Sequence, residues 1–551
     1  MLRTYCSNLI KCKDGIITFI TPLILSPLLL YSYDSMESRC AFVVLLMIIY
    51  WIFQPIPLAV TALLPVALFP LLGLADTEKA CGPYLKSTNM LFMSSLIIAI
   101  AVESSNFHKR IAYKFLIKIG SDLRSLFAGF MLITMFLGIW IINTAATAMI
   151  LPVADVVVGE IFDPILSSFS NQNQSMEQSI ELMENHQKYN NDIENKNFHK
   201  KHNPIRKELE YVKRLLYICI AFSATIGGTT TLTSNGPNLV FQFVMDEFFT
   251  GVNDVDYTRW LLFCLPATIL SVLSLWLFIS IYYLRSKSVK QLRKLSKSTL
   301  IAKYEQLGSI TFYELAVCSM FLMLIILWMF RDPRFLPGWA RLLNHKIIPK
   351  DTTPAIFVVV LLFCIPSNPF GPYPSKSLLD WNYVQSKLAW GVILLRGGGF
   401  AVAETASSSG LATLIGKQLL KINQLPLWAV VISISFLASL TTELASNSAI
   451  ASLFLPISGQ LAMFLNQNPL LFIIPVTLSC SFAFVLPVGT PANALVATHA
   501  KLSPFDMLVP GLVAKILCTI IMFLNLYIVG VPTFDLNLQP DWINSTKLDR
   551  I

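Results

Sequence analysis

The chain alternates long apolar stretches with short polar breaks. Three stretches without a charged residue lie at 127–142, 260–284 and 315–330, and each has about the length that a helix needs to cross a bilayer. Other apolar runs predict helices near residues 16–32, 40–54, 58–75, 89–105, 355–366, 389–403, 469–486 and 508–530. The pattern predicts an all-α polytopic membrane protein.

Two longer apolar runs, at 125–162 and 427–465, are interrupted by the same motif. Each contains an Asn followed 9 residues later by a Pro, namely Asn143 with Pro152 and Asn447 with Pro456. Further along each half, a second polar break contains a Pro and an Asn and is followed by an apolar helix, at 233–240 and at 488–496. The paired motifs indicate an internal duplication.

The spacing of the motifs supports this duplication. The Asn of the first motif precedes the Asn of the second by 95 residues in the first half and by 46 in the second half. The difference of 49 is about the length of the polar segment 163–213, which we expect to be a cytoplasmic, partly disordered loop. Repeated halves with Gly- or Pro-interrupted apolar segments at corresponding positions are typical of secondary transporters, whose site lies at the repeat interface.

These observations divide the chain into two repeated halves. The first covers 1–285 and includes the interrupted run 125–162, and the second covers 311–551 and includes the interrupted run 427–465. A basic linker at 286–310, expected to be cytoplasmic, joins them.

Composition and charge agree with a membrane location. Of 551 residues, 55% are hydrophobic and only 13% are charged, which is unlike a soluble domain. The net charge of +9 is concentrated in short segments, which indicates loops held on the cytoplasmic side rather than nucleic-acid binding. Basic residues before the first span predict a cytoplasmic N-terminus. A sequon at Asn544 predicts an extracellular, glycosylated C-terminus, and together they require an odd number of crossings.

The four polar breaks share one chemistry. Each supplies Ser, Thr or Asn together with Gly or Pro, and none contains Lys, Arg, Asp or Glu. Irregular backbone at membrane depth is tolerated only where it is buried in protein or lines a cavity. Amide, hydroxyl and carbonyl oxygens suit a sodium ion, whereas helix N-termini that begin at the breaks suit an anion. We expect anion binding that depends on bound sodium.

At these residues the sequence resembles the divalent anion:sodium symporters, which include the sodium-dependent di/tricarboxylate and sulfate transporters of solute carrier family 13. The resemblance covers nearly the whole chain. It rests on the segments 140–149 (WIINTAATAM), 442–447 (TELASN), 57–65 (PLAVTALLP), 227–233 (GGTTTLT), 331–333 (RDP), 397–400 (GGGF) and 481–491 (SFAFVLPVGTP).

The resemblance implies about eleven transmembrane helices plus two re-entrant hairpins, at 125–162 and 427–465, in two halves arranged as inverted repeats. It also implies a plasma-membrane homodimer that moves its transport domain as an elevator. It assigns sodium to two sets of residues, Asn143, Gly228, Thr233 and Asn238 in the first half, and Ser446, Asn447, Gly489 and Asn493 in the second. It assigns the substrate to Asn143, Thr144, Ser234, Asn235, Ser446, Asn447, Ser448, Thr490 and Pro491. Sodium is then a co-transported ion, and no cofactor is implied.

Some positions depart from the family pattern. The first tip has Ile142 where the family usually has Ser, the segment 233–235 replaces the usual Thr-Gly-Thr, Ala492 replaces a Pro, and the segment 53–54 replaces a Thr-Glu pair. The Ala-rich run after Thr144 favours carboxylate over sulfate. A sodium–sulfate symporter and a carboxylate carrier without sodium coupling remain the alternatives.

Two other classes of protein fit the sequence less well. A membrane enzyme needs an acid/base or metal constellation in a span, and a channel needs a filter ring or a charged pore.

Glu443 is expected to orient the second tip by accepting backbone N–H groups, with a proton site as the alternative. Arg396 is expected to snorkel to lipid headgroups rather than to contact substrate.

Overall fold

The computed structural model describes residues 13–30, 35–119, 122–162, 191–249, 255–285, 297–332, 337–343, 348–371, 376–411, 413–414 and 426–538. Within these ranges every regular element is a helix, apart from one isolated bridge between Pro366 and Ser377. The predicted all-α class is therefore confirmed. The sequon at Asn544 lies outside the described residues.

Eight helical segments among the described residues are long and apolar enough to span a membrane. They are Met36–Phe53, Thr77–Ser104, Leu123–Trp140, Asn143–Ile161, Tyr257–Tyr282, Phe312–Met329, Asn447–Phe464 and Pro504–Phe534. Shorter apolar helices lie at Asp14–Leu29, Leu58–Leu71, Thr352–Cys364, Leu427–Thr441 and Pro469–Ser481. The length and apolar character of these helices agree with a polytopic membrane protein. The total of eleven spans stays a prediction.

All four predicted breaks separate helices in the structure. The helices on either side are α10 (Leu123–Trp140) and α11 (Asn143–Ile161), α13 (Asn191–Gly228) and α14 (Gly236–Phe248), α24 (Leu427–Thr441) and α25 (Asn447–Phe464), and α26 (Pro469–Ser481) and α27 (Pro491–His499). In every pair the second helix begins at or beside the Gly, Pro or Asn of the motif, because these residues favour turns and the first positions of helices.

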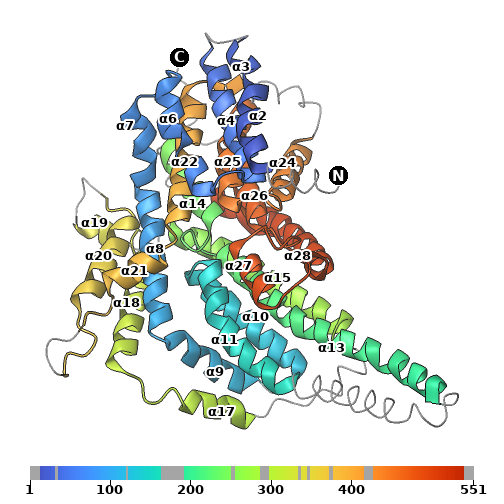
Figure 1. The fold of residues 1–551 in the computed structure, drawn as a ribbon. Coiled ribbons are helices and arrows are strands. Elements are labelled where there is room, and N and C mark those ends of the chain that lie inside the picture. Colours follow the sequence, from blue (N-terminus) through green and yellow to red (C-terminus); the bar gives the residue numbers. More distant parts are fainter. Residues whose placement is uncertain are drawn as a thin grey trace.

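The two halves pack reciprocally around these breaks. Helices α10 and α11 pack on α13 of their own half, and α24 and α25 pack on α26 of theirs. The last helix of each set, α14 in the first half and α27 in the second, packs against the other half. Helix α14 packs against α25, and α27 packs against α11 (Figure 1). Most of the buried apolar side chains on these helices belong to one continuous core.

A smaller apolar core lies beside the main one. It joins α4 (Met36–Phe53), α5 (Leu58–Thr61), α6 (Leu64–Leu71) and one side of α22 (Trp390–Ser408). The other side of α22, with Phe400 and Ala403, packs in the main core. Helix α22 therefore forms the boundary between the two cores.

The remaining helices complete the fold (Figure 1). They are α2 (Lys13–Leu25), α3 (Pro27–Leu30), α7 (Thr77–Cys81), η1 (Gly82–Leu85), α8 (Ser87–Ser104), α9 (Phe107–Ile119), α15 (Tyr257–Tyr282), α17 (Lys297–Glu305), α18 (Phe312–Met329), α19 (Trp339–Leu343), α20 (Thr352–Cys364), α21 (Trp381–Lys387), α28 (Pro504–Asn525), η3 (Leu526–Gly530) and α29 (Val531–Phe534).

Two segments expected to be loops are partly helical. Residues 163–190 of the expected loop 163–213 lie outside the described residues, but α13 already begins at Asn191. In the linker 286–310, residues 297–305 form α17. Low hydrophobicity favoured a loop in both places, yet Lys, Glu and Arg are good helix formers and can sustain a polar helix.

Candidate functional site

The first tip lies between α10 and α11, and its polar residue is buried. Asn143 begins α11, and its side-chain Oδ1 has no hydrogen-bond partner among the described residues. A methyl group on Gly228, at the end of α13, would collide with this oxygen, so only glycine permits the close approach. Thr144 follows on α11 and is half-buried. The tip therefore presents an unused amide oxygen to the first break.

The loop between α13 and α14, residues 229–235, is the first break, and Asn238 in the first turn of α14 closes it. The amide of Asn238 donates hydrogen bonds to the backbone oxygens of Gly228 (3.3 Å), Thr229 (3.1 Å) and Thr231 (2.8 Å). Its own Oδ1 is buried and lacks a partner within the described chain. Asn238 thus fixes the loop with its nitrogen and keeps its oxygen available.

Hydroxyl groups hold the same loop from within. The Ser234 hydroxyl donates to the Gly228 carbonyl at 2.8 Å and lies 2.8 Å from the Thr231 hydroxyl. The Thr231 hydroxyl donates its single proton to the Ile139 carbonyl of α10 at 2.6 Å. The Thr233 hydroxyl lies 3.4 Å from that of Tyr257 on α15. These bonds hold the loop in place, and the assignment of Ser234 to the substrate site stays a prediction.

The second tip, between α24 and α25, is tied to the body of its own half. The Thr442 hydroxyl lies 2.7 Å from Asn447 Oδ1, to which it donates, and 2.8 Å from the Cys480 carbonyl of α26. Ser446 precedes α25 and is half-buried, whereas Ser448 is buried in its first turn. The amide oxygen of this tip is therefore already engaged.

The second break, 482–490, closes in the same way as the first. The Asn493 amide donates to the carbonyls of Ala483 (3.0 Å) and Leu486 (3.4 Å), and its Oδ1 is buried without a partner in the described structure. Thr490 caps α27 by accepting the Asn493 backbone N–H at 3.1 Å. Asn493 thus plays the part in the second half that Asn238 plays in the first.

A buried ion pair supports the second break. Glu443 accepts the backbone N–H groups of Phe484, Val485 and Leu486, each at 3.1 Å, and pairs with Lys515 Nζ at 2.7 Å. The expectation that Glu443 accepts backbone N–H groups is confirmed, but they belong to the second break rather than to the tip. Lys515 was missed. A lone Lys in the apolar helix α28 was the available signal.

The first break also lies against the second tip. A methyl group on Gly236, at the start of α14, would collide with the Ser448 hydroxyl. The Asn235 amide donates to Ser481 Oγ at 2.8 Å, at the end of α26. Because Gly228 faces the first tip and Gly236 faces the second, the residues between them lie between the two tips. Pro491 is exposed and Gly489 is buried close to Glu443.

The arrangement suits a cation and an anion together. The carboxamide oxygens of Asn143, Asn238 and Asn493 are buried and have no hydrogen-bond partner within the described part of the chain, and such oxygens are ligands that a hard cation accepts. Helices α11, α14, α25 and α27 all begin at the breaks, so their N-terminal N–H groups favour negative charge there.

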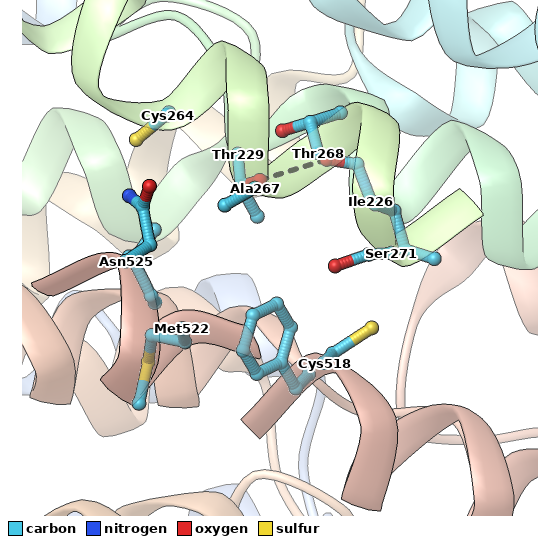
Figure 2. Close-up of a pocket in the computed structure, with 11 residues that line it drawn as sticks. Ile226, Thr229, Cys264, Ala267, Thr268, Ser271, Cys518, Met522 and Asn525 are labelled. Carbon is cyan, nitrogen blue, oxygen red and sulfur yellow. Dashed lines mark hydrogen bonds between the residues drawn. The ribbon is translucent and has the colours of Figure 1, made fainter. Parts of the chain in front are cut away.

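A separate small cavity of ≈ 20 Å³ lies behind the first break. Figure 2 shows its polar lining, in which the Thr229 hydroxyl donates to the Ile226 carbonyl at 2.7 Å and Ser271 and Asn525 approach from α15 and α28. The cavity has room for about one water molecule and is too small for a polycarboxylate. It is therefore distinct from the tips.

Arg396 does not lie where the sequence predicted. Instead of reaching a headgroup region, its side chain is buried with 1% of its surface exposed. Its guanidinium lies over the ring of Phe92, 4.3 Å from the ring centroid. The expectation of snorkelling was wrong, because α22 is enclosed between the two cores.

Comparison with known proteins identifies the family. The model of the sodium:sulfate symporter transmembrane region matches residues 15–532. The chain is 36% identical to the rat Na(+)/citrate cotransporter, covering 99% of both chains. It is 35% identical to the human Na(+)/dicarboxylate cotransporter 3, covering 96% of this chain and 93% of that protein.

An invertebrate relative extends the same pattern. The chain is 35% identical to the sodium-dependent low-affinity dicarboxylate transporter 1 of Caenorhabditis elegans, covering 98% of this chain and 95% of that protein. The family match covers both tips and both breaks, which are the segments that carry the paired motifs. The chain therefore belongs to the sodium:sulfate symporter family, a family of membrane transporters rather than enzymes.

Proposed function

We propose that the chain is a sodium-coupled symporter that carries di- and tricarboxylates such as succinate and citrate across the plasma membrane. The observation that carries this proposal is the placement of the first break between both tips, through Gly228 at Asn143 and Gly236 at Ser448. The relatives named as citrate and dicarboxylate cotransporters support the choice of substrate class.

Two sodium sites follow from the paired breaks. Asn143, Gly228, Thr233 and Asn238 form the first set, and Ser446, Asn447, Gly489 and Asn493 form the second. Each set includes an Asn that closes its loop with its nitrogen and leaves its oxygen without a protein partner. These neutral ligands add no charge that would offset bound sodium, so sodium binding would raise the affinity for an anion, which couples the two.

The substrate lies between the tips in this proposal. Its carboxylates meet the starts of α11 and α25, at Asn143, Thr144, Ser446, Asn447 and Ser448. Residues of the first and second breaks complete the site, namely Ser234, Asn235, Thr490 and Pro491. Of these, Ser234 acts through the loop that it holds.

The hairpins enter and leave the membrane on one side in this proposal. The support is the burial of Asn143 and Ser448 at the tips, inside the helical bundle.

We further propose a homodimer in the lipid bilayer, with a cytoplasmic N-terminus, an extracellular C-terminus and elevator-like alternating access between the two cores. A sodium–sulfate symporter is the second candidate, because the matching family model describes sodium:sulfate symporters.

Uptake into proteoliposomes tests the function. Radiolabelled succinate and citrate are supplied with sodium or with choline in its place, and sulfate is added as a competitor. We expect saturable uptake that requires sodium and resists sulfate. Uptake that is equal in choline would contradict sodium coupling, and sulfate entry without carboxylate entry would establish the second candidate.

A further inference from the structure

Arg396 is a buried cation to which no role has been assigned above. None of its three guanidinium nitrogens has a hydrogen-bond acceptor among the described residues. Its contacts are the rings of Phe92, at 4.3 Å from the ring centroid, and Phe400, at 5.4 Å. Aromatic faces attract a cation, but they do not accept the hydrogen bonds of five N–H groups.

The other buried Lys and Arg side chains of the described chain are paired. Arg110 binds the Glu314 carboxylate at 3.1 Å and three backbone carbonyls, and Lys515 binds Glu443 at 2.7 Å. A buried charge without a partner is strongly unfavourable, so a site that retains one is expected to receive a counter-charge. For Arg396 no carboxylate of the described protein supplies it.

The helix register places Arg396 beside the second tip. Gly399 of α22 lies against Ser452 of α25, and Ser407 Oγ accepts a hydrogen bond from Gln460 at 3.5 Å. In both contacts the residue number rises in the same direction along the two helices, so α22 and α25 run parallel. The same register brings Arg396 level with Ala449, one residue beyond Ser448.

Helix α14 runs beside α22 in the same direction. The ring of Phe243 stacks on Phe400 with centroids 3.9 Å apart, and one turn later Lys86 pairs with both Glu247 of α14 (2.8 Å) and Glu404 of α22 (2.9 Å). Arg396 lies one turn before Phe400 on α22, and its guanidinium lies over Phe400 and over Phe92 of α8. The first turns of α14 and α25 therefore lie at its level.

We propose that Arg396 binds one carboxylate of the substrate beside the second tip and favours tricarboxylates over dicarboxylates. The planar guanidinium matches a carboxylate through two parallel hydrogen bonds. The nearby N-termini of α14 and α25 add partial positive charge, which attracts an anion and opposes a bare cation. A third negative charge gains most from this environment. The inference rests on the proposed function and adds a specificity-determining residue to it.

The test compares wild type with Arg396→Leu, Arg396→Lys and Arg110→Leu. The KM and maximal rate of citrate and succinate uptake are measured at saturating sodium, together with surface expression. We expect Arg396→Leu to raise the KM for citrate about tenfold more than that for succinate, since one charged hydrogen-bonded contact is lost. Arg396→Lys keeps the positive charge but lacks the planar guanidinium that can donate two parallel hydrogen bonds. It should therefore restore part of the lost preference for citrate over succinate.

Arg110→Leu is the matched control, because this arginine is equally buried but already paired. It should lower expression and the maximal rate for both substrates alike. If Arg396→Leu behaves in that way, with an unchanged ratio of the two KM values, the guanidinium is structural and the inference is wrong.

A binding measurement separates this inference from the proposed function. The melting temperature of the purified wild type and of Arg396→Leu is measured with citrate, succinate, sulfate or chloride. If wild type fails to take up carboxylates, the proposed function fails, and a citrate-induced stabilisation that is lost in Arg396→Leu would still support the anion site. Stabilisation by chloride alone, or equal stabilisation of both proteins by every anion, would overturn it.

Discussion

The first break, 229–235, and the second break, 482–490, close in the same way but are supported differently. Asn238 and Asn493 each stand three residues into their helix and donate to the carbonyls of the preceding loop. In the first half the loop is then held by hydroxyls, including the Thr231 bond to the Ile139 carbonyl. In the second half it is held by Glu443, whose carboxylate takes three backbone N–H groups.

The position four residues before each tip Asn shows the origin of the difference. Ile139 and Glu443 occupy that position in the two halves, and both are buried. The first offers only its backbone oxygen to the loop, whereas the second offers a charged side chain that needs Lys515 as a counter-charge. The two halves share the closing Asn, but different chemistry supports the loop around it.

The largest effect is expected at Glu443. Glu443→Ala leaves Lys515 buried without its carboxylate and three N–H groups without an acceptor, and loss of one partner of a buried pair costs about 3–5 kcal/mol. We expect loss of surface expression or of transport, measured by biotinylation, uptake and the melting temperature in detergent. The double variant Glu443→Leu with Lys515→Met removes both charges and should regain stability without regaining transport. Equal instability of the single and double variants would contradict the ion-pair account.

The second prediction compares the two tips. Asn143 Oδ1 has no partner in the described chain, whereas Asn447 Oδ1 accepts from Thr442 at 2.7 Å. Asn143→Ala and Asn447→Ala should each abolish uptake while surface expression persists, because each removes a proposed sodium ligand. Any residual activity should require more sodium in Asn143→Ala than in Asn447→Ala, since only the first removes an uncommitted oxygen.

Asn468→Ala is the control for these variants. Asn468 caps α26 by accepting the Leu470 N–H at 3.0 Å and lies outside the breaks. Its loss should cost about 1 kcal/mol of stability and leave the sodium dependence unchanged. Normal uptake in either tip variant would remove these residues from the proposed site.

Much of this arrangement was predictable from local sequence. The paired motifs located all four breaks, because Asn, Gly and Pro favour turns and the first positions of helices. Pro152 and Pro456 are exceptions, since both lie inside helices, α11 and α25. Contacts between distant segments were not predictable. Nothing in the sequence near Lys515 names Glu443 as its partner, and the burial of Arg396 depends on the two cores that enclose α22. The helical start of α13 could not be predicted from polarity, because polar residues occur both in loops and in exposed helices.

The smallest effect is expected at Ser234, which separates support of the first break from direct substrate contact. Its hydroxyl donates to the Gly228 carbonyl, to which Asn238 also donates at 3.3 Å, so Ser234→Ala removes one of two bonds. We expect a loss of about 1 kcal/mol in stability, seen as a lower melting temperature, with the KM for carboxylates nearly unchanged. Ser458→Ala is the matched control, since this buried hydroxyl bonds only within its own helix, to Phe454. A several-fold rise in KM at unchanged melting temperature would instead place Ser234 in contact with substrate. The hydroxyls of the first break would then bind substrate in addition to holding the loop, whereas the Glu443 carboxylate of the second half is engaged by three backbone N–H groups and Lys515.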